Sequence, residues 1–111
     1  MRNFYTVVLE RMNTFTEDFA TEPYETGWAS EAMFFIRVHE MAGSKVELDS
    51  VVQVSADGIE WIDEGTSFLM MRQPGNSFVK VTHFGGWLRL RNELSGSNPK
   101  VKVTIHLVLK E

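Results

Sequence analysis

The sequence predicts an all-β fold, an antiparallel β-sandwich of jelly-roll or galactose-binding-like type with about seven to nine strands. Three observations lead to this prediction. Apolar and polar residues alternate with a period of two along several segments. Glycine, proline, asparagine and aspartate separate these segments at short intervals. No segment requires more than a turn or two of helix, and a chain of 111 residues holds one core, so residues 1–111 are assigned to a single β-sandwich domain.

The first two strands are predicted before residue 40. One follows from Tyr5, Val7 and Leu9, which alternate with their neighbours, and the other spans residues 32–38. In the second strand Met33 and Phe35 occupy the outward positions and are also apolar. We therefore expect this strand to be covered on both faces or to lie under a partner subunit. The irregular residues 13–30 between the two strands are predicted to be a long loop or short strands.

The middle of the chain predicts a hairpin. A strand runs from Val46 to Val54, and its alternation slips at Asp49 and Ser50, which indicates a bulge or a break. Asp57-Gly58 then predicts a tight turn, because glycine adopts positive φ without steric cost. The strand is expected to resume over residues 59–62.

The remaining strands are predicted from the turn residues between them. The expected order is a turn at Glu64-Gly65, an extended stretch over 67–71, a loop over 73–76, a strand over 78–83, a turn at Gly85-Gly86 and a strand over 87–91. In the strand over 87–91, Leu88 and Leu90 are predicted to point inward. Residues 95–99 are predicted to be a loop before the last strand. That strand has the most regular alternation and places these residues inward: Val101, Val103, Ile105, Leu107 and Leu109.

One local pattern also resembles a known family. Asp57 and Gly58 reverse the chain, Ser55 can hydrogen-bond across the turn, and Trp61 covers the hairpin or the end of the core. The stretch over 54–61, Val-Ser-Ala-Asp-Gly-Ile-Glu-Trp, resembles the strand and turn of discoidin-type β-sandwiches, the coagulation factor 5/8 type C or galactose-binding-like domains. The stretch over 87–91, Trp-Leu-Arg-Leu-Arg, resembles a later strand of that family. The resemblance covers 51–62 and 84–91 and implies the sandwich, without a sugar or lipid specificity.

Composition narrows the function classes. The chain has no cysteine, which excludes disulfides, thiolate metal sites and a cysteine nucleophile. A net charge of -4 argues against nucleic acid as a partner. The first twelve residues hold no uninterrupted apolar run, and no segment is long and apolar enough to cross a bilayer. We therefore expect no signal peptide and no membrane partner, and a protein that is cytoplasmic as synthesised and is kept there or incorporated into a particle.

The charges are unevenly distributed along the chain. Residues 1–79 hold five basic and thirteen acidic groups, whereas residues 80–111 hold six basic and two acidic groups. Two interpretations remain open. Strands from the two halves can form ordinary cross-strand ion pairs, or an acidic face can meet a basic face of a neighbouring copy in a head-to-tail assembly.

No motif points to catalysis. The sequence has no nucleophile elbow, phosphate loop, zinc-binding histidine pair or dinucleotide fingerprint, so we predict no enzymatic activity and no cofactor. The three histidines, His39, His83 and His106, lie in separate predicted strands, which predicts exposed or half-buried side chains and no metal site. The acids Asp57, Glu60, Asp63 and Glu64 lack the spacing of a calcium loop, and a solvated acidic edge is the favoured interpretation.

Two groups of residues are candidates for contacts with other molecules. The candidate binding residues are Trp28, Tyr24, Trp61, Trp87 and Arg89, because aromatic groups either plug the end of a sandwich or stack on a sugar. The candidate assembly residues are Met33, Phe35, Met70 and Met71, which add apolar surface that the pattern does not require. The leading hypothesis is a non-catalytic structural protein that forms a homo-oligomer within a larger assembly, as a decoration or tail component of a phage or phage-like particle. The alternative is a carbohydrate-binding module with a glycan as partner.

Overall fold

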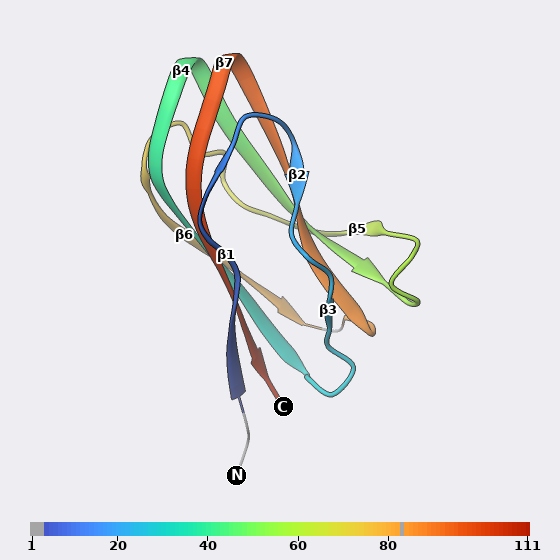
Figure 1. Ribbon diagram of the computed structural model, residues 1–111. Coiled ribbons are helices and arrows are strands. Elements are labelled where there is room, and N and C mark those ends of the chain that lie inside the picture. The colour runs from blue at the N-terminus through green and yellow to red at the C-terminus, as the bar shows by residue number, and fades with distance from the viewer. Residues whose placement is uncertain (1–3, 83) are drawn as a thin grey trace.

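The computed structural model describes residues 4–82 and 84–111, which form seven strands and no helix (Figure 1). The strands are β1 (Phe4–Phe15), β2 (Phe19–Ala20), β3 (Tyr24–Glu25), β4 (Glu31–Ser55), β5 (Ile62–Ser67), β6 (Gly75–Thr82) and β7 (Trp87–Lys110). Their pairings are antiparallel. The predicted all-β class is confirmed. In the described part of the chain there is accordingly no helix able to span a membrane.

Two long strands organise the fold. β4 and β7 pair along their whole lengths, from Glu31 opposite Lys110 to Ser55 opposite Trp87. Both turn over near their midpoints, at the top of Figure 1, so that a single hydrogen-bonded sheet becomes two layers. The buried side chains of both halves pack into one cluster. The predicted sandwich is therefore confirmed, although its two central strands are far longer than the short strands we expected.

Each layer contains half of each long strand. The first layer has the order β6, first half of β4, second half of β7, β1. The second layer has the order β5, second half of β4, first half of β7, with the short strands β2 and β3 at its edge. Across β4 and β7, the acidic Glu40 is the register partner of the basic Lys102.

The inward positions follow the predicted alternation closely. The side chains at 32, 34, 36 and 38 of β4 are buried, as are those at 88 and 90 and at the odd positions from 101 to 109 of β7. Among the largest is Phe34, whose ring has no exposed surface. The residues between them lie at the outer surface of the sandwich. The alternation of apolar and polar residues therefore predicts both the core face and the outer face of these strands correctly.

The corner between the layers replaces a predicted loop. Residues 95–99 lie within β7, and the prediction of a loop there is wrong. Gly96 and Asn98 have φ of 117° and 50°, and Gly43 and Lys45 in β4 have φ of 114° and 55°. Four residues of left-handed backbone turn both strands over while pairing continues on either side, with shifts of register at the corner. Turn-forming residues thus bend a strand pair here without ending it.

The predicted slip at Asp49 and Ser50 is also wrong. Pairing with β7 continues without a shift through both residues. Ser50 is simply an inward polar residue, and its hydroxyl donates a hydrogen bond of 2.6 Å to Oδ1 of Asn92, which is buried as well. The irregularity in this part of β4 occurs against β5 instead, between Val51 and Gln53.

Several boundaries after residue 58 differ from the prediction, and one of them is the start of β6 at Gly75, inside the loop expected over 73–76. The strand expected over 59–62 begins only at Ile62. The backbone N–H groups of Ile59 and Glu60 donate to the carboxylate of Asp57 instead of pairing with a strand. Gly65 has a φ of 112° but lies inside β5, so it is no turn. Of the stretch over 67–71, Ser67 ends β5 and Met71 forms a single bridge to Leu48. His83, at the end of the strand predicted over 78–83, lies outside the described residues.

Candidate functional site

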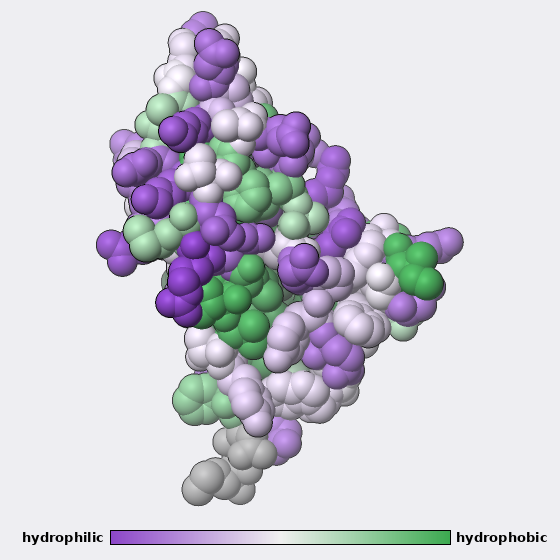
Figure 2. All heavy atoms as spheres, viewed as in Figure 1, coloured by the Kyte–Doolittle hydropathy of each residue, from purple (hydrophilic) through white to green (hydrophobic). Residues whose placement is uncertain are grey.

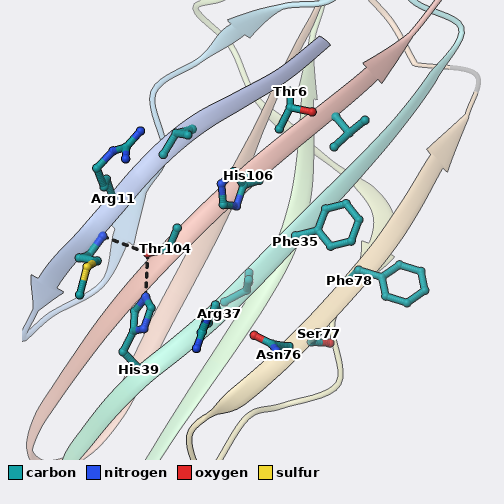
Figure 3. Close-up of a pocket in the computed structure, with 14 residues that line it drawn as sticks. Thr6, Arg11, Phe35, Arg37, His39, Asn76, Ser77, Phe78, Thr104 and His106 are labelled. Atoms are coloured by element: carbon teal, nitrogen blue, oxygen red, sulfur yellow. Dashed lines mark hydrogen bonds between the residues drawn. The ribbon is translucent and has the colours of Figure 1, made fainter. Parts of the chain in front are cut away.

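An open groove of about 780 Å³ lies on the outer face of the first layer, across β1, β7, β4 and β6 (Figure 3). We call it the outer groove and define it by six of its lining residues: Val8, Phe35, Arg37, His39, Phe78 and His106. These side chains stand on the outward positions of their strands, opposite the core. The groove therefore results from the same alternation that builds the sandwich.

The floor of the outer groove is apolar. Phe35 of β4 lies opposite Phe78 of β6, and their rings stack with centroids 5.7 Å apart. Phe78 is 52% exposed, and Met12, at the β1 side, is 53% exposed. Adjacent apolar side chains on the outer face of a sheet are typical of contact surfaces, because an antiparallel sheet whose outer face meets only water has polar residues there.

A hydrogen-bonded group forms one wall of the outer groove. Nε2 of His39 lies 2.8 Å from the hydroxyl oxygen of Thr104. The same oxygen accepts a hydrogen bond of 3.1 Å from the backbone N–H of Met12. These contacts join β1, β7 and β4, as the dashed lines in Figure 3 show. Within residues 4–82 and 84–111, no three histidine, aspartate or glutamate side chains are grouped so as to hold a metal ion.

The rim of the outer groove is basic. Arg11 and Arg37 line it, and Lys80 lies two residues beyond Phe78 on the outward side of β6. Because these cations come from three strands of one layer, their fields add over the apolar floor. The surface suits a partner that is apolar at its centre and acidic at its edge.

A second feature lies at the opposite side of the molecule, in the connection from β4 to β5 and the first residue of β5. We call residues 56–62 the β4–β5 tip. Ile59 is 79% exposed and Ile62 is 68% exposed. Strongly hydrophobic atoms accordingly appear at the right-hand end of the molecule in Figure 2, where Figure 1 shows this connection.

Asp57 holds the β4–β5 tip in shape. Its Oδ1 accepts hydrogen bonds from the backbone N–H of Ile59, at 2.8 Å, and of Glu60, at 3.0 Å. The hydroxyl of Ser55 accepts a bond of 2.8 Å from the N–H of Gly58, which has a φ of 80°. The turn predicted at Asp57-Gly58 is confirmed, as is the bond across it from Ser55.

These bonds predict a pH dependence of stability. The backbone bonds from Ile59 and Glu60, with the Ser55 hydroxyl, lower the pKa of Asp57 below its ordinary value of 3.8. A carboxyl group whose pKa is lower in the folded than in the unfolded state stabilises the protein at any pH above its unfolded-state pKa. This contribution to stability is lost as the pH falls through the pKa of the folded state. We expect acidification from about pH 6 to about pH 2.5 to reduce the urea midpoint more in the wild type than in Asp57→Asn. Equal reductions would mean that the tip bonds do not depend on the charge of Asp57.

Three of the predicted binding residues come together at the tip, namely Trp61 of the tip itself and Trp87 and Arg89 of β7. The guanidinium of Arg89 lies 4.4 Å from the ring centroid of Trp61, and the ring of Trp87 lies directly under Gly58. Nε of Arg89 donates a 2.8 Å bond to Gln53, which in turn donates a 2.9 Å bond to Asp63. Burial, with the nearby charge of Arg91, lowers the pKa of Arg89. The two tryptophans thus brace the tip, and Ile59 and Ile62 remain as its exposed apolar groups.

The other two predicted binding residues lie elsewhere. Tyr24, on β3, packs against the core. Trp28 contacts Tyr5 of β1 edge to face, with ring centroids 5.6 Å apart. The five candidates therefore do not share one surface.

The predicted assembly residues also divide. Phe35 lies in the outer groove, and Met33 lies one outward position along the same strand. Met71 packs against the core, and Met70 lies in the loop after β5 with its sulfur 3.7 Å from Arg72. Sequence reasoning missed Phe78 and Val8 as groove residues. Their outward positions on alternating strands were the available signal.

Comparison with known proteins bears on the fold. No protein-family model and no curated protein sequence matches this chain. The PBSX exported protein XepA is similar in structure, with a TM-score of 0.61 and 10% identity over 98% of this chain and 36% of that one. The SPBc2 prophage-derived protein YomS has a TM-score of 0.59 and 9% identity over 100% of this chain and 96% of that one. Dimeric latent PorU from Porphyromonas gingivalis has a TM-score of 0.60 and 10% identity over 99% of this chain and 13% of that one.

The three similarities agree on a β-sandwich. The chain spans about a third of the length of XepA but nearly all of YomS. Identities of 9% to 10% establish the fold alone. None of the three is named as a discoidin domain, so the part of that resemblance supported here is the sandwich.

Proposed function

We propose that the protein is a non-catalytic structural sandwich that associates with copies of itself through the outer groove, as a component of a phage or phage-like particle. The observation that carries this proposal is the apolar floor of the groove, where the exposed ring of Phe78 stacks on the half-buried ring of Phe35 on the outer face of a four-stranded layer. A layer that met only water would not need these rings outward, since burying one aromatic side chain is worth about 1.5 to 3 kcal/mol.

The phage assignment is supported by the similar structures. Two of them are named as a PBSX exported protein and as a prophage-derived protein. The similarity covers nearly the whole chain of the second, so a sandwich of this size occurs in a prophage-derived protein. A particle component needs contact surfaces and no active site, which agrees with the groove described above.

A substitution in the groove tests self-association. We expect Phe78→Asp to weaken association at least about tenfold, because it places a charge in the centre of an apolar contact. The matched control is Leu69→Asp, which also replaces an exposed apolar side chain by a carboxylate, at a residue that is 87% exposed but lies outside the groove. Light scattering coupled to size-exclusion chromatography measures the mass of each. Equal masses for the two variants would reject the groove as the contact surface.

A carbohydrate-binding module is the second candidate. It is favoured by the chain of contacts from Trp61 through Arg89 and the buried Gln53 to Asp63, which brings an aromatic ring, a guanidinium and a carboxylate together. A glycan array separates the two candidates. Binding to a sugar requires this second surface and leaves the mass of the protein unchanged.

A further inference from the structure

We propose that the β4–β5 tip of one copy docks into the outer groove of the next copy, so that the protein assembles head to tail. This inference rests on the proposed function and names the two surfaces that meet. The tip supplies exposed Ile59 and Ile62 flanked by acids, and the groove supplies an apolar floor with a basic rim.

The backbone of the tip is already ordered in the single copy. Its backbone is fixed by the bonds from Asp57 and Ser55, and the ring of Trp87 supports it from below. A contact made by a segment that is already ordered loses little conformational entropy on binding. The same bonds keep Ile59 pointing into solvent, where it has no core to join.

The groove matches the tip in charge. Glu60 belongs to the tip, and Asp63 and Glu64 follow it in β5. Arg11 and Arg37 line the groove, with Lys80 beside it. Opposite charges around an apolar centre guide the encounter and fix the orientation of the two copies. Two copies placed groove to groove would instead bring two basic rims together.

The groove matches the tip in size as well. A volume of about 780 Å³ lies within the range of sites that enclose a small ligand, so it has room for a pair of isoleucine side chains. The floor at Phe35 and Phe78 would then be covered by the apolar groups that are most exposed at the tip.

The position of the two surfaces determines the kind of assembly. The groove belongs to the layer of β6, β4, β7 and β1, whereas the tip projects from the β5 end of the other layer, at the right in Figure 1. A tip therefore reaches the groove of another copy and not its own. Such a heterologous contact builds a ring when the rotation closes and a filament when it does not.

A mixing experiment tests this arrangement. Ile59→Lys places a cation in a basic-rimmed groove and disables the tip, and Phe78→Asp disables the groove. We expect each variant alone to associate at least about tenfold more weakly than the wild type. Each should therefore be monomeric at a protein concentration at which the wild type just assembles. Mixed together, they should form a one-to-one pair, because one functional tip and one functional groove remain. A variant that carries both substitutions, mixed with Phe78→Asp, is the control and should stay monomeric, since no functional groove is left. Unchanged melting temperatures verify that the variants are folded.

The outcomes separate this inference from the proposed function. If Ile59→Lys still assembles like the wild type while Phe78→Asp does not, the groove receives another surface, and the head-to-tail inference is wrong. The same holds if the two variants fail to pair when mixed. If the wild type itself remains monomeric, the proposed self-association fails as well.

Discussion

We expect Gly96→Ala to lower the free energy of unfolding by about 3 kcal/mol, through backbone strain and steric overlap together. Gly96 has a φ of 117°, which a residue with a Cβ atom rarely adopts. A Cβ atom at this position would lie 2.8 Å from the carbonyl oxygens of Ser44 and Lys45 on the neighbouring strand. These oxygens belong to the backbone and cannot move aside without opening the corner.

Two other glycines provide graded controls, measured with Gly96→Ala by urea denaturation. Gly65 has a similar φ of 112° but open space around it, so Gly65→Ala should show the strain alone, about 1 to 2 kcal/mol. Gly75→Ala should change the stability by less than about 1 kcal/mol, because a Cβ atom there meets nothing within 4 Å and the φ is not in the left-handed region. Equal stabilities of the Gly96 and Gly75 variants would contradict the role given to the corner.

Phe34→Ala should be about as damaging, with a loss of about 3 to 5 kcal/mol. The ring of Phe34 has no exposed surface and lies in the cluster that joins the two layers. Its removal loses the transfer free energy of the ring and leaves a cavity between rigid strands, which cannot collapse fully.

The adjacent residue is the matched control for Phe34. Phe35 is the same residue type on the same strand, but it faces the outer groove and is only partly buried. At a protein concentration low enough to keep the chains apart, Phe35→Ala should lose less than half as much stability as Phe34→Ala in the same urea titration. Similar losses at both positions would mean that the inward and outward faces of β4 are assigned incorrectly.

The predicted parts of the fold are those that depend on neighbours in the sequence. Alternation placed Phe34 and Ile36 inward and Phe35 outward, and the structure agrees. The same reasoning found the inward face of β7 from Val101 to Leu109. A period of two is a local property, because each side chain reports the face of its own strand.

The corner could not be predicted in this way. Ser95, Gly96, Ser97 and Asn98 are typical of a loop between strands, and the same residue types also bend a strand that continues. Whether such a segment ends a strand depends on the partner backbone. Here the partner is a segment of β4 some fifty residues earlier, whose own Gly43 makes room for it.

The prediction of a break at Ser50 is wrong for a related reason. Ser50 interrupts an apolar alternation, and the sequence alone suggested a break in the strand. Its partner is Asn92, which is 42 positions away and equally buried. A polar residue satisfied inside a core looks like a defect until its partner is known.

The candidate site was predicted in part. Outward apolar residues identified Met33 and Phe35 on the face that holds the outer groove. The role of Phe78 depends on the register that sets it opposite Phe35, which no local pattern specifies. Trp61, Trp87 and Arg89 proved to be neighbours, whereas Tyr24 and Trp28 were grouped with them only by residue type.

Sedimentation equilibrium of the wild-type protein tests the central claim most directly, since it weighs the assembly at each protein concentration. With a functional tip and a functional groove on every copy, the average mass should rise above that of one chain over about a hundredfold increase in concentration. A mass that stays at one chain throughout that range would contradict the claim that the outer face of the first layer is covered by a second copy.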